Sequence, residues 1–256
     1  RVMGGEKADM IITSPPYAVG KEYEKDITFE MHLTQLRGFA TMAIESVCPG
    51  GFICINFGEI APLSHAAPLT GSKRQCVYPI SKDYWQIFHI ENKCDLYAQR
   101  IWYKPFNRLQ QPFWTYHTSI PHYQEWEHIW TWRAPGGEED MAYDWDISVR
   151  AVWDTRHEST DDKPLTRHVA AFPVCLPERA IKAHSKIHAT ILDPFLGSGT
   201  TLIAAHQLDR TCYGLELEPR YVDVICRRFV SFVSSPEGVW CERDGERLTY
   251  QELFGE

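Results

Sequence analysis

Several patterns that would assign a function class are missing from this 256-residue sequence. No run approaches the 18 apolar residues that suggest a membrane span, and the first residues show no basic-then-apolar leader. The eight cysteines form no Cys-x-x-Cys pair and have no metal-ligand spacing, so no metal site is expected. Because most of these cysteines lie in apolar runs, we expect reduced, buried thiols and a cytoplasmic protein.

The remaining composition is ordinary for a globular protein, with 44% hydrophobic and 23% charged residues. The length accommodates one sizeable α/β core with an inserted lobe. The net charge of -8 argues mildly against a nucleic-acid partner, since phosphate contacts dominate such affinities. Residues 72–108, however, carry seven Lys and Arg against three Asp and Glu, a local excess of +4. A solvated face explains this run as well as a nucleic-acid surface does.

The most informative stretch is Ile191–Thr201, Ile-Leu-Asp-Pro-Phe-Leu-Gly-Ser-Gly-Thr-Thr. Apolar residues predict a strand that stops at Asp193. Gly197 and Gly199 allow a tight turn that a ligand can approach closely, and a helix is expected over 200–208. A strand, a glycine turn and a helix form the first unit of a nucleotide-binding α/β sheet, where ligands lie at the carboxyl ends of strands.

This turn lacks two features of better-known nucleotide loops. It has no Gly-Lys-Ser/Thr, which argues against a triphosphate-binding P-loop, and no third glycine of a dinucleotide fingerprint. A second strand is predicted over 211–216 and ends in Glu216, 17 residues after Gly199. A carboxylate there can accept hydrogen bonds from a ribose diol. Together the two strands favour an adenosine-containing cofactor without a pyrophosphate.

A second motif lies near the start of the chain. Residues 8–13 predict a short buried strand that continues directly into Ser14-Pro15-Pro16-Tyr17. Two consecutive prolines cannot donate ladder hydrogen bonds and fix φ, so the strand must stop and the loop is stiff. By itself this pattern could be only a strand-terminating turn.

Asp-Pro-Phe-Leu-Gly-Ser-Gly-Thr-Thr resembles the S-adenosylmethionine motif of the amino-group DNA methyltransferases, and Ser-Pro-Pro-Tyr resembles their catalytic motif. The order, catalytic motif first and cofactor motif last, is similar to the permuted beta group of that family. The resemblance implies an α/β, Rossmann-like methyltransferase sheet with helices on both faces and an inserted target-recognition region. It also implies S-adenosylmethionine as cofactor, double-stranded DNA as substrate and, in a restriction-modification system, a companion endonuclease.

The resemblance assigns site residues in the same way. Ser14, Pro15, Pro16 and Tyr17 are the catalytic candidates. The cofactor-binding candidates are Asp193, Phe195, Gly197, Ser198, Gly199, Thr200, Thr201 and Glu216, with His168 and Phe172 from the segment that helps to enclose the methionine end in relatives. The serine form of the catalytic motif is most typical of enzymes acting on the N4 amine of cytosine, whereas aspartate is commoner for the N6 amine of adenine.

The expected organisation follows from these motifs. Relatives carry a Gly-Asp pair upstream of the catalytic strand that is absent or altered here, so the residue that contacts the adenine is not assigned. The first residues look like an interior segment, and we therefore expect a longer natural chain. The predicted units are a catalytic half over 1–104, a target-recognition insertion over 105–150, a cofactor-binding half over 151–235 and a C-terminal hairpin over 236–256. Further helices are expected over 27–47, 84–92 and 219–228, and further strands over 52–58, 96–104 and 126–132.

Four functions stay open at this point. The leading one is methylation of cytosine N4 in DNA, and the nearest alternative is methylation of adenine N6 by the same mechanism. A methyltransferase acting on RNA or on protein amides, and a DNA-binding module without catalysis, are the other two. Trp126 to Trp132 alternates like a strand, so its aromatic side chains are expected in the core. Over 105–124, Arg, Gln and aromatic residues without such a period favour a nucleic acid, since Arg and Gln suit base edges and aromatics suit stacking.

Overall fold

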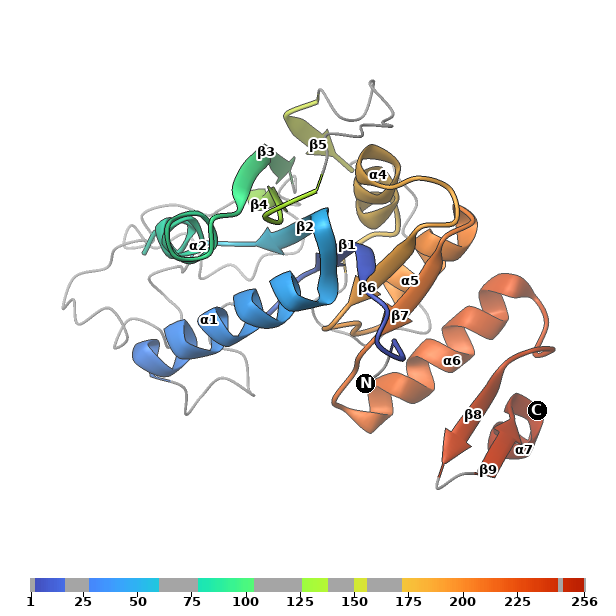
Figure 1. Cartoon of the computed structure of the whole chain (residues 1–256). Helices are drawn as coiled ribbons and strands as arrows, with labels where there is room; N and C mark the ends of the chain where they lie inside the picture. Colours follow the sequence, from blue (N-terminus) through green and yellow to red (C-terminus); the bar gives the residue numbers. More distant parts are fainter. Residues whose placement is uncertain are drawn as a thin grey trace, which may run out of the picture.

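The computed structural model describes residues 3–16, 28–59, 78–103, 126–137, 150–155, 172–243 and 246–255. Within these ranges, one seven-stranded sheet in the order β5-β3-β4-β2-β1-β6-β7 forms the centre of the molecule (Figure 1). Its strands are β1 (Ala8–Thr13), β2 (Val47–Phe57), β3 (Asp95–Tyr103), β4 (Trp126–Arg133), β5 (Val152–Asp154), β6 (Thr190–Asp193) and β7 (Thr211–Gly214).

The first strand of the chain lies in the middle of this sheet. β1 pairs in parallel with β2 on one side, with Thr13 opposite Ile55, and with β6 on the other, with Ile11 opposite Leu192. β6 pairs in parallel with β7, whereas β4 runs antiparallel to both β2 and β3. The carboxyl ends of β1, β2, β6 and β7 therefore meet at one edge of the sheet, which is where a doubly wound α/β fold binds its ligands.

Helices cover both faces of the sheet, as the sequence predicts (Figure 1). One hydrophobic cluster packs Leu36, Phe39 and Ala40 against Ile11 and Ile53 of the sheet. A second packs helical residues against Met10, Ile12 and Cys54, which point to the other face. The helices are α1 (Phe29–Ser46), α2 (Ser81–Trp85) with a π-helical continuation (Gln86–Glu91), α4 (Cys175–His184), α5 (Thr200–Gln207), α6 (Pro219–Val233) and α7 (Tyr250–Phe254).

Most of the predicted elements are confirmed, and the main difference lies after α1. We expected a helix over 27–47 and a strand starting at residue 52, but β2 already begins at Val47. Val47 pairs with Ala8, and the register then shifts before Phe52 pairs with Met10. A bulge of this kind accommodates the extra residues without ending the strand.

Trp130 and Trp132 confirm the core role expected for the aromatic strand. Their exposed fractions are 7% and 0% in β4, and Phe88 stacks on Trp132 with ring centroids 5.3 Å apart. The predicted C-terminal hairpin is also confirmed as β8 (Trp240–Arg243) paired with β9 (Glu246–Thr249). It continues into α7, a short helix that the sequence did not predict, and Thr249 forms its capping box with Glu252.

The cysteines are less buried than expected. The six cysteines whose side chains the structure describes are free thiols, and Cys54 and Cys94 are the buried ones among them. None of the helices in the described ranges has the length and apolar character needed to cross a membrane.

Candidate functional site

The two sequence motifs meet at the carboxyl ends of β1 and β6. Thr13, the last residue of β1, donates a hydrogen bond of 2.6 Å from its hydroxyl to Oδ1 of Asp193, the last residue of β6, across 180 positions of sequence. Ser14 follows Thr13 directly, and the glycine loop follows Asp193. The contact therefore places the predicted catalytic motif beside the predicted cofactor motif.

Asp193 is the centre of a buried hydrogen-bond network. Its side chain is 1% exposed, and besides Thr13 it accepts bonds from the Thr201 hydroxyl at 2.6 Å and the Phe195 backbone N–H at 3.0 Å. Burial raises the pKa of Asp193 to about 6, although the hydrogen bonds from Thr13, Thr201 and Phe195 oppose this shift. The carboxylate thus ties β1, the loop and α5 together.

The glycine loop turns where the sequence predicts. Gly197 and Gly199 have φ values of 57° and 81°, which disfavour residues with a side chain. At Gly199 a Cβ would also lie 3.1 Å from Ile225 of α6. Gly214 at the end of β7 has a different constraint, because a Cβ there would lie 2.4 Å from a methyl carbon of Leu196. Close packing of the loop against β7 and α6 therefore depends on these glycines.

Glu216 lies just beyond the carboxyl end of β7, in a half-buried position. β7 ends two residues earlier than expected, at Gly214. The two carboxylate oxygens of Glu216 accept hydrogen bonds of 2.8 Å from the backbone N–H groups of Gly197 and Glu218. The carboxylate therefore joins the glycine loop to the start of α6, while it remains accessible enough to meet a ligand.

The hydroxyl residues of the cofactor motif point into the protein. Ser198, Thr200 and Thr201 are buried, and Thr201 binds Asp193. Arg228 of α6, itself 6% exposed, donates from Nη1 to the Ser198 carbonyl at 3.1 Å, the Ser198 hydroxyl at 3.2 Å and the Thr200 hydroxyl at 2.8 Å. The buried guanidinium of Arg228 therefore fixes the glycine loop from the side of α6.

The catalytic motif lies at the same edge. Ser14 is half-buried, Pro15 is buried and Pro16 is exposed at the end of β1. Tyr17 and His168, two other predicted site residues, lie outside the described residues. Phe172 is described and lies between the sheet and α4.

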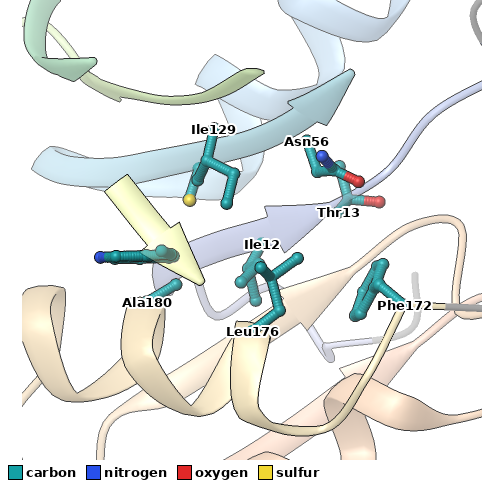
Figure 2. Close-up of a pocket in the computed structure, with 9 residues that line it drawn as sticks. Ile12, Thr13, Asn56, Ile129, Phe172, Leu176 and Ala180 are labelled. Atoms are coloured by element: carbon teal, nitrogen blue, oxygen red, sulfur yellow. The ribbon is translucent and has the colours of Figure 1, made fainter. Parts of the chain in front are cut away.

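A small hollow lies beside Thr13, between the sheet and α4 (Figure 2). Its wall combines apolar side chains with two polar ones, Thr13 and Asn56, which lie near each other in Figure 2. The lining residues are Ile12, Thr13, Cys54, Asn56, Ile129, Trp153, Phe172, Leu176 and Ala180. Phe172, assigned by resemblance to the cofactor side, and Thr13 thus share one cavity next to the catalytic motif.

Exposed apolar side chains surround the ends of β6 and β7. Phe195 is 39% exposed, Leu215 is 41% exposed and Leu217 is 98% exposed. Phe195 also packs against Phe39 of α1, with ring centroids 5.8 Å apart. Apolar surface next to the half-buried Glu216 carboxylate suits a ligand that has both a flat ring and a ribose diol.

The basic excess over 72–108 does not form one surface in the part of the chain that is described. Arg100 is 2% exposed and lies against the Trp153 ring and His184, the latter at 3.1 Å. Lys82 binds Asp83 at 3.0 Å, and Lys93 donates to the Ile90 carbonyl. Counting Arg100 toward a nucleic-acid surface was therefore wrong. The other four basic residues of this run, 73, 74, 104 and 108, lie outside the described residues.

Three residues of the site have no counterpart among the sequence predictions. Thr13 could have been found, because it ends the strand directly before the catalytic motif. Arg228 follows Tyr221 and Ile225 at helical spacing, so its position on the buried face of α6 could also have been predicted. Asn56 offered no signal, since a single polar residue late in an apolar strand does not reveal which cavity it lines.

With this geometry in place, comparisons with known proteins identify the family. The model of the DNA methylase family of N6 and N4 methyltransferases matches residues 8–227. The chain belongs to this family. S-adenosylmethionine is its cofactor, and the carboxyl-end edge of the sheet, with its glycine turn, apolar side chains and half-buried carboxylate, fits that molecule.

Individual relatives agree with this assignment. The type II methyltransferase M.ScaI of Streptomyces caespitosus is 25% identical, over 86% of this chain and 74% of the relative. M.BglI of Bacillus subtilis is 25% identical, over 90% of this chain and 82% of the relative.

Among solved structures, TTHA0409 of Thermus thermophilus, complexed with S-adenosyl-L-methionine, has a TM-score of 0.66. It is 26% identical, and the match covers 91% of this chain and 90% of that chain. The cytosine-N4-specific PvuII DNA methyltransferase has a TM-score of 0.69 at 18% identity, over 89% of this chain and 82% of that chain, and shows the shared fold.

Proposed function

We propose that this DNA methyltransferase transfers a methyl group from S-adenosylmethionine to the exocyclic N4 amine of a cytosine in double-stranded DNA. The observation that carries the proposal is the 2.6 Å hydrogen bond between Thr13 and Asp193. It joins the Ser14-Pro15-Pro16 loop to the glycine loop, so an amine bound at the first loop faces a cofactor bound at the second. The serine of the motif supports cytosine rather than adenine.

Ser14 and Pro15 would activate the amine. The cofactor supplies an electrophilic methyl on a sulfonium, so the difficult partner is the amine, whose lone pair is delocalised into the base. The Ser14 hydroxyl oxygen and the Pro15 carbonyl oxygen accept hydrogen bonds from the amine N–H groups. These bonds favour a pyramidal nitrogen and stabilise the positive charge that develops on it. Two prolines fix the loop, so little reorganisation is needed.

Duplex stacking hides the target amine, so the base must leave the helix to reach Ser14. We assign to Tyr17, on the basis of the motif alone, the stacking surface for the extruded base. Pro16, exposed at the rim, contributes to the rigidity of the loop and to its outer wall.

The cofactor residues divide into three groups in this proposal. Glu216 accepts hydrogen bonds from the ribose hydroxyls, Phe195 contributes apolar contact, and Gly197 and Gly199 let the backbone approach the methionyl group. Asp193, Ser198, Thr200 and Thr201 act through the buried bonds that hold this loop in shape. Phe172 and, from the resemblance, His168 enclose the methionine end.

The test is methyl transfer from labelled S-adenosylmethionine to mixed-sequence duplex DNA, followed by digestion and mass spectrometry of the nucleosides. N4-methylcytosine supports the proposal. N6-methyladenine would keep the mechanism and overturn the base. No product on DNA, with cofactor binding intact by calorimetry, would reject DNA as the substrate and direct the assay to RNA and protein amides.

The type II relatives also support a pairing with a restriction endonuclease, and protection of modified DNA from cleavage would test it.

A further inference from the structure

A second polar cluster lies at the same edge of the sheet, on the side away from the cofactor loop. Oε1 of Glu59, two residues after β2, lies 2.8 Å from Nε2 of His128 in β4 and forms a hydrogen bond with it. It also accepts hydrogen bonds from the Ser81 hydroxyl at 2.6 Å and the Ser81 backbone N–H at 3.2 Å. One carboxylate therefore joins the end of β2, the start of β4 and the start of α2.

The cluster is shielded from water. The side chains of Glu59 and His128 are 10% and 13% exposed. Burial raises the pKa of Glu59, but the hydrogen bonds from His128 and Ser81 outweigh it, and the net pKa lies below the usual value. The His128 ring also packs against Phe57 at 4.8 Å and against Trp126 at 4.8 Å. The buried Glu59 carboxylate fixes the positions of His128 and Ser81, because loss of any one of these partners would leave buried polar groups without a hydrogen bond.

A chain of contacts leads from this cluster to the catalytic motif. Thr13 pairs with Ile55, so the next residues along the two parallel strands are Ser14 and Asn56. Asn56 is 5% exposed and donates a 3.1 Å hydrogen bond from Nδ2 to the His128 carbonyl. Figure 2 shows the Asn56 side chain near Thr13 at the hollow. The position of His128 thus fixes Asn56, which lies beside Ser14.

His128 lies near the start of β4, which pairs with both β2 and β3 in the sheet. Anything that shifts His128 shifts both this strand and Asn56.

We propose that Glu59, His128 and Ser81 are positioning residues for the DNA substrate, which align the substrate side of the site with Ser14 and leave cofactor binding alone. This inference rests on the proposed function. Breaking the cluster should lower turnover of DNA without a matching loss of cofactor affinity, because Asp193 and Arg228 hold the cofactor loop separately.

The experiment compares four variants with the wild type. Glu59→Gln removes the charge in nearly the same volume. His128→Phe keeps the ring packing but removes the N–H donor, whereas His128→Gln keeps a donor. Glu91→Gln, at the end of the π-helix that follows α2, is the matched control, since it removes an exposed ion pair with Arg37 of α1. The measurements are kcat and KM for unmethylated duplex DNA, the cofactor Kd by calorimetry and Tm.

We expect Glu59→Gln and His128→Phe to lower kcat/KM for DNA about tenfold or more, with the cofactor Kd within about twofold of the wild type. His128→Gln should regain most of the loss, and Glu91→Gln should behave as the wild type. DNA turnover unchanged in Glu59→Gln and His128→Phe would overturn the inference, as would a cofactor Kd that weakens by the same factor as turnover. If His128→Phe does not fold, Glu59→Gln decides alone. A wild type inactive on all duplex DNA would instead overturn the proposed function, and this inference with it.

Discussion

The two loops that meet at the edge of the sheet are fixed by different means. The cofactor loop contains glycines, which have no conformational preference of their own, and it is held by buried side chains, Asp193 from one side and Arg228 from the other. The catalytic loop contains two prolines whose rings fix φ. A glycine turn therefore takes its shape from its surroundings, whereas a proline turn carries most of its shape in its own covalent structure.

This difference predicts where each loop is vulnerable. Polar substitutions and changes of pH should act on the cofactor loop through the hydrogen bonds of Asp193 and Arg228. They should therefore change cofactor affinity and folding stability together. On the catalytic loop, removal of the Ser14 hydroxyl, which we propose to activate the amine, should affect turnover alone. The four predictions that follow test this contrast, from the largest expected effect to the smallest.

Ser14→Ala should lower kcat by about 100- to 1,000-fold, the range typical for removal of one group that stabilises charge in a transition state. Cofactor affinity and Tm should stay unchanged, because the prolines still set the loop. Steady-state kinetics on duplex DNA measure kcat, calorimetry with S-adenosylmethionine measures the cofactor affinity, and thermal unfolding measures Tm. Full activity of Ser14→Ala would remove Ser14 from the mechanism.

Asp193 should make stability depend on pH. Its pKa is about 6 in the folded protein against 3.8 ordinarily, so the folded state favours the protonated acid. The stability that the protonated Asp193 contributes is fully present below about pH 4 and is lost as pH rises through about 6. The free energy of unfolding falls by about 3 kcal/mol over this range. Urea unfolding between about pH 4 and 7 measures it, with Asp193→Asn as the variant in which this component should vanish. Identical pH profiles for the two proteins would contradict the assignment.

Arg228→Met should weaken cofactor binding about tenfold and destabilise the fold by about 2 kcal/mol, because buried acceptors of Ser198 and Thr200 lose their donor. Arg220→Met on the same helix is the control, since its side chain is 93% exposed. Calorimetry and urea unfolding report the two effects. If Arg228→Met binds the cofactor as Arg220→Met does, the glycine loop does not need support from α6.

Glu216→Ala should raise the cofactor Kd up to about tenfold, because it removes the carboxylate that we propose as acceptor for the ribose hydroxyls and that accepts a hydrogen bond from the Gly197 N–H. Turnover at saturating cofactor should change little. Glu242→Gln in the remote hairpin gives the baseline. An unchanged Kd in Glu216→Ala would exclude the ribose role.

The parts of this protein that could be predicted from sequence are those carried by consecutive residues. The two motifs, the strands that lead into them and the glycine turn are local patterns, and the periodicity of residues 27–47 and 126–132 predicts α1 and β4. The antiparallel placement of β4 between β2 and β3, in contrast, is set by packing across the sheet, which no local pattern reports.

Long-range polar contacts were the least predictable features. Arg100 was counted with a basic surface because its neighbours in sequence are basic, yet the strand turns it inward onto Trp153. Glu59 and His128 are 69 positions apart, and neither lies in a motif. Asp193 and Thr201 were identified as site residues, but only the fold shows that they bond to each other.

The central place of β1 in the sheet also has a consequence for how the protein is made. β1 leaves the ribosome long before its partner β6, since the contacting ends of the two strands are 180 positions apart. Pairing across such a separation is slow, because a long loop must close first. Until then β1 presents an unpaired, apolar edge to its surroundings. Nascent chains should therefore depend on chaperones until Thr190–Asp193 has left the exit tunnel, and ribosome-bound chains stalled before that point should aggregate on release.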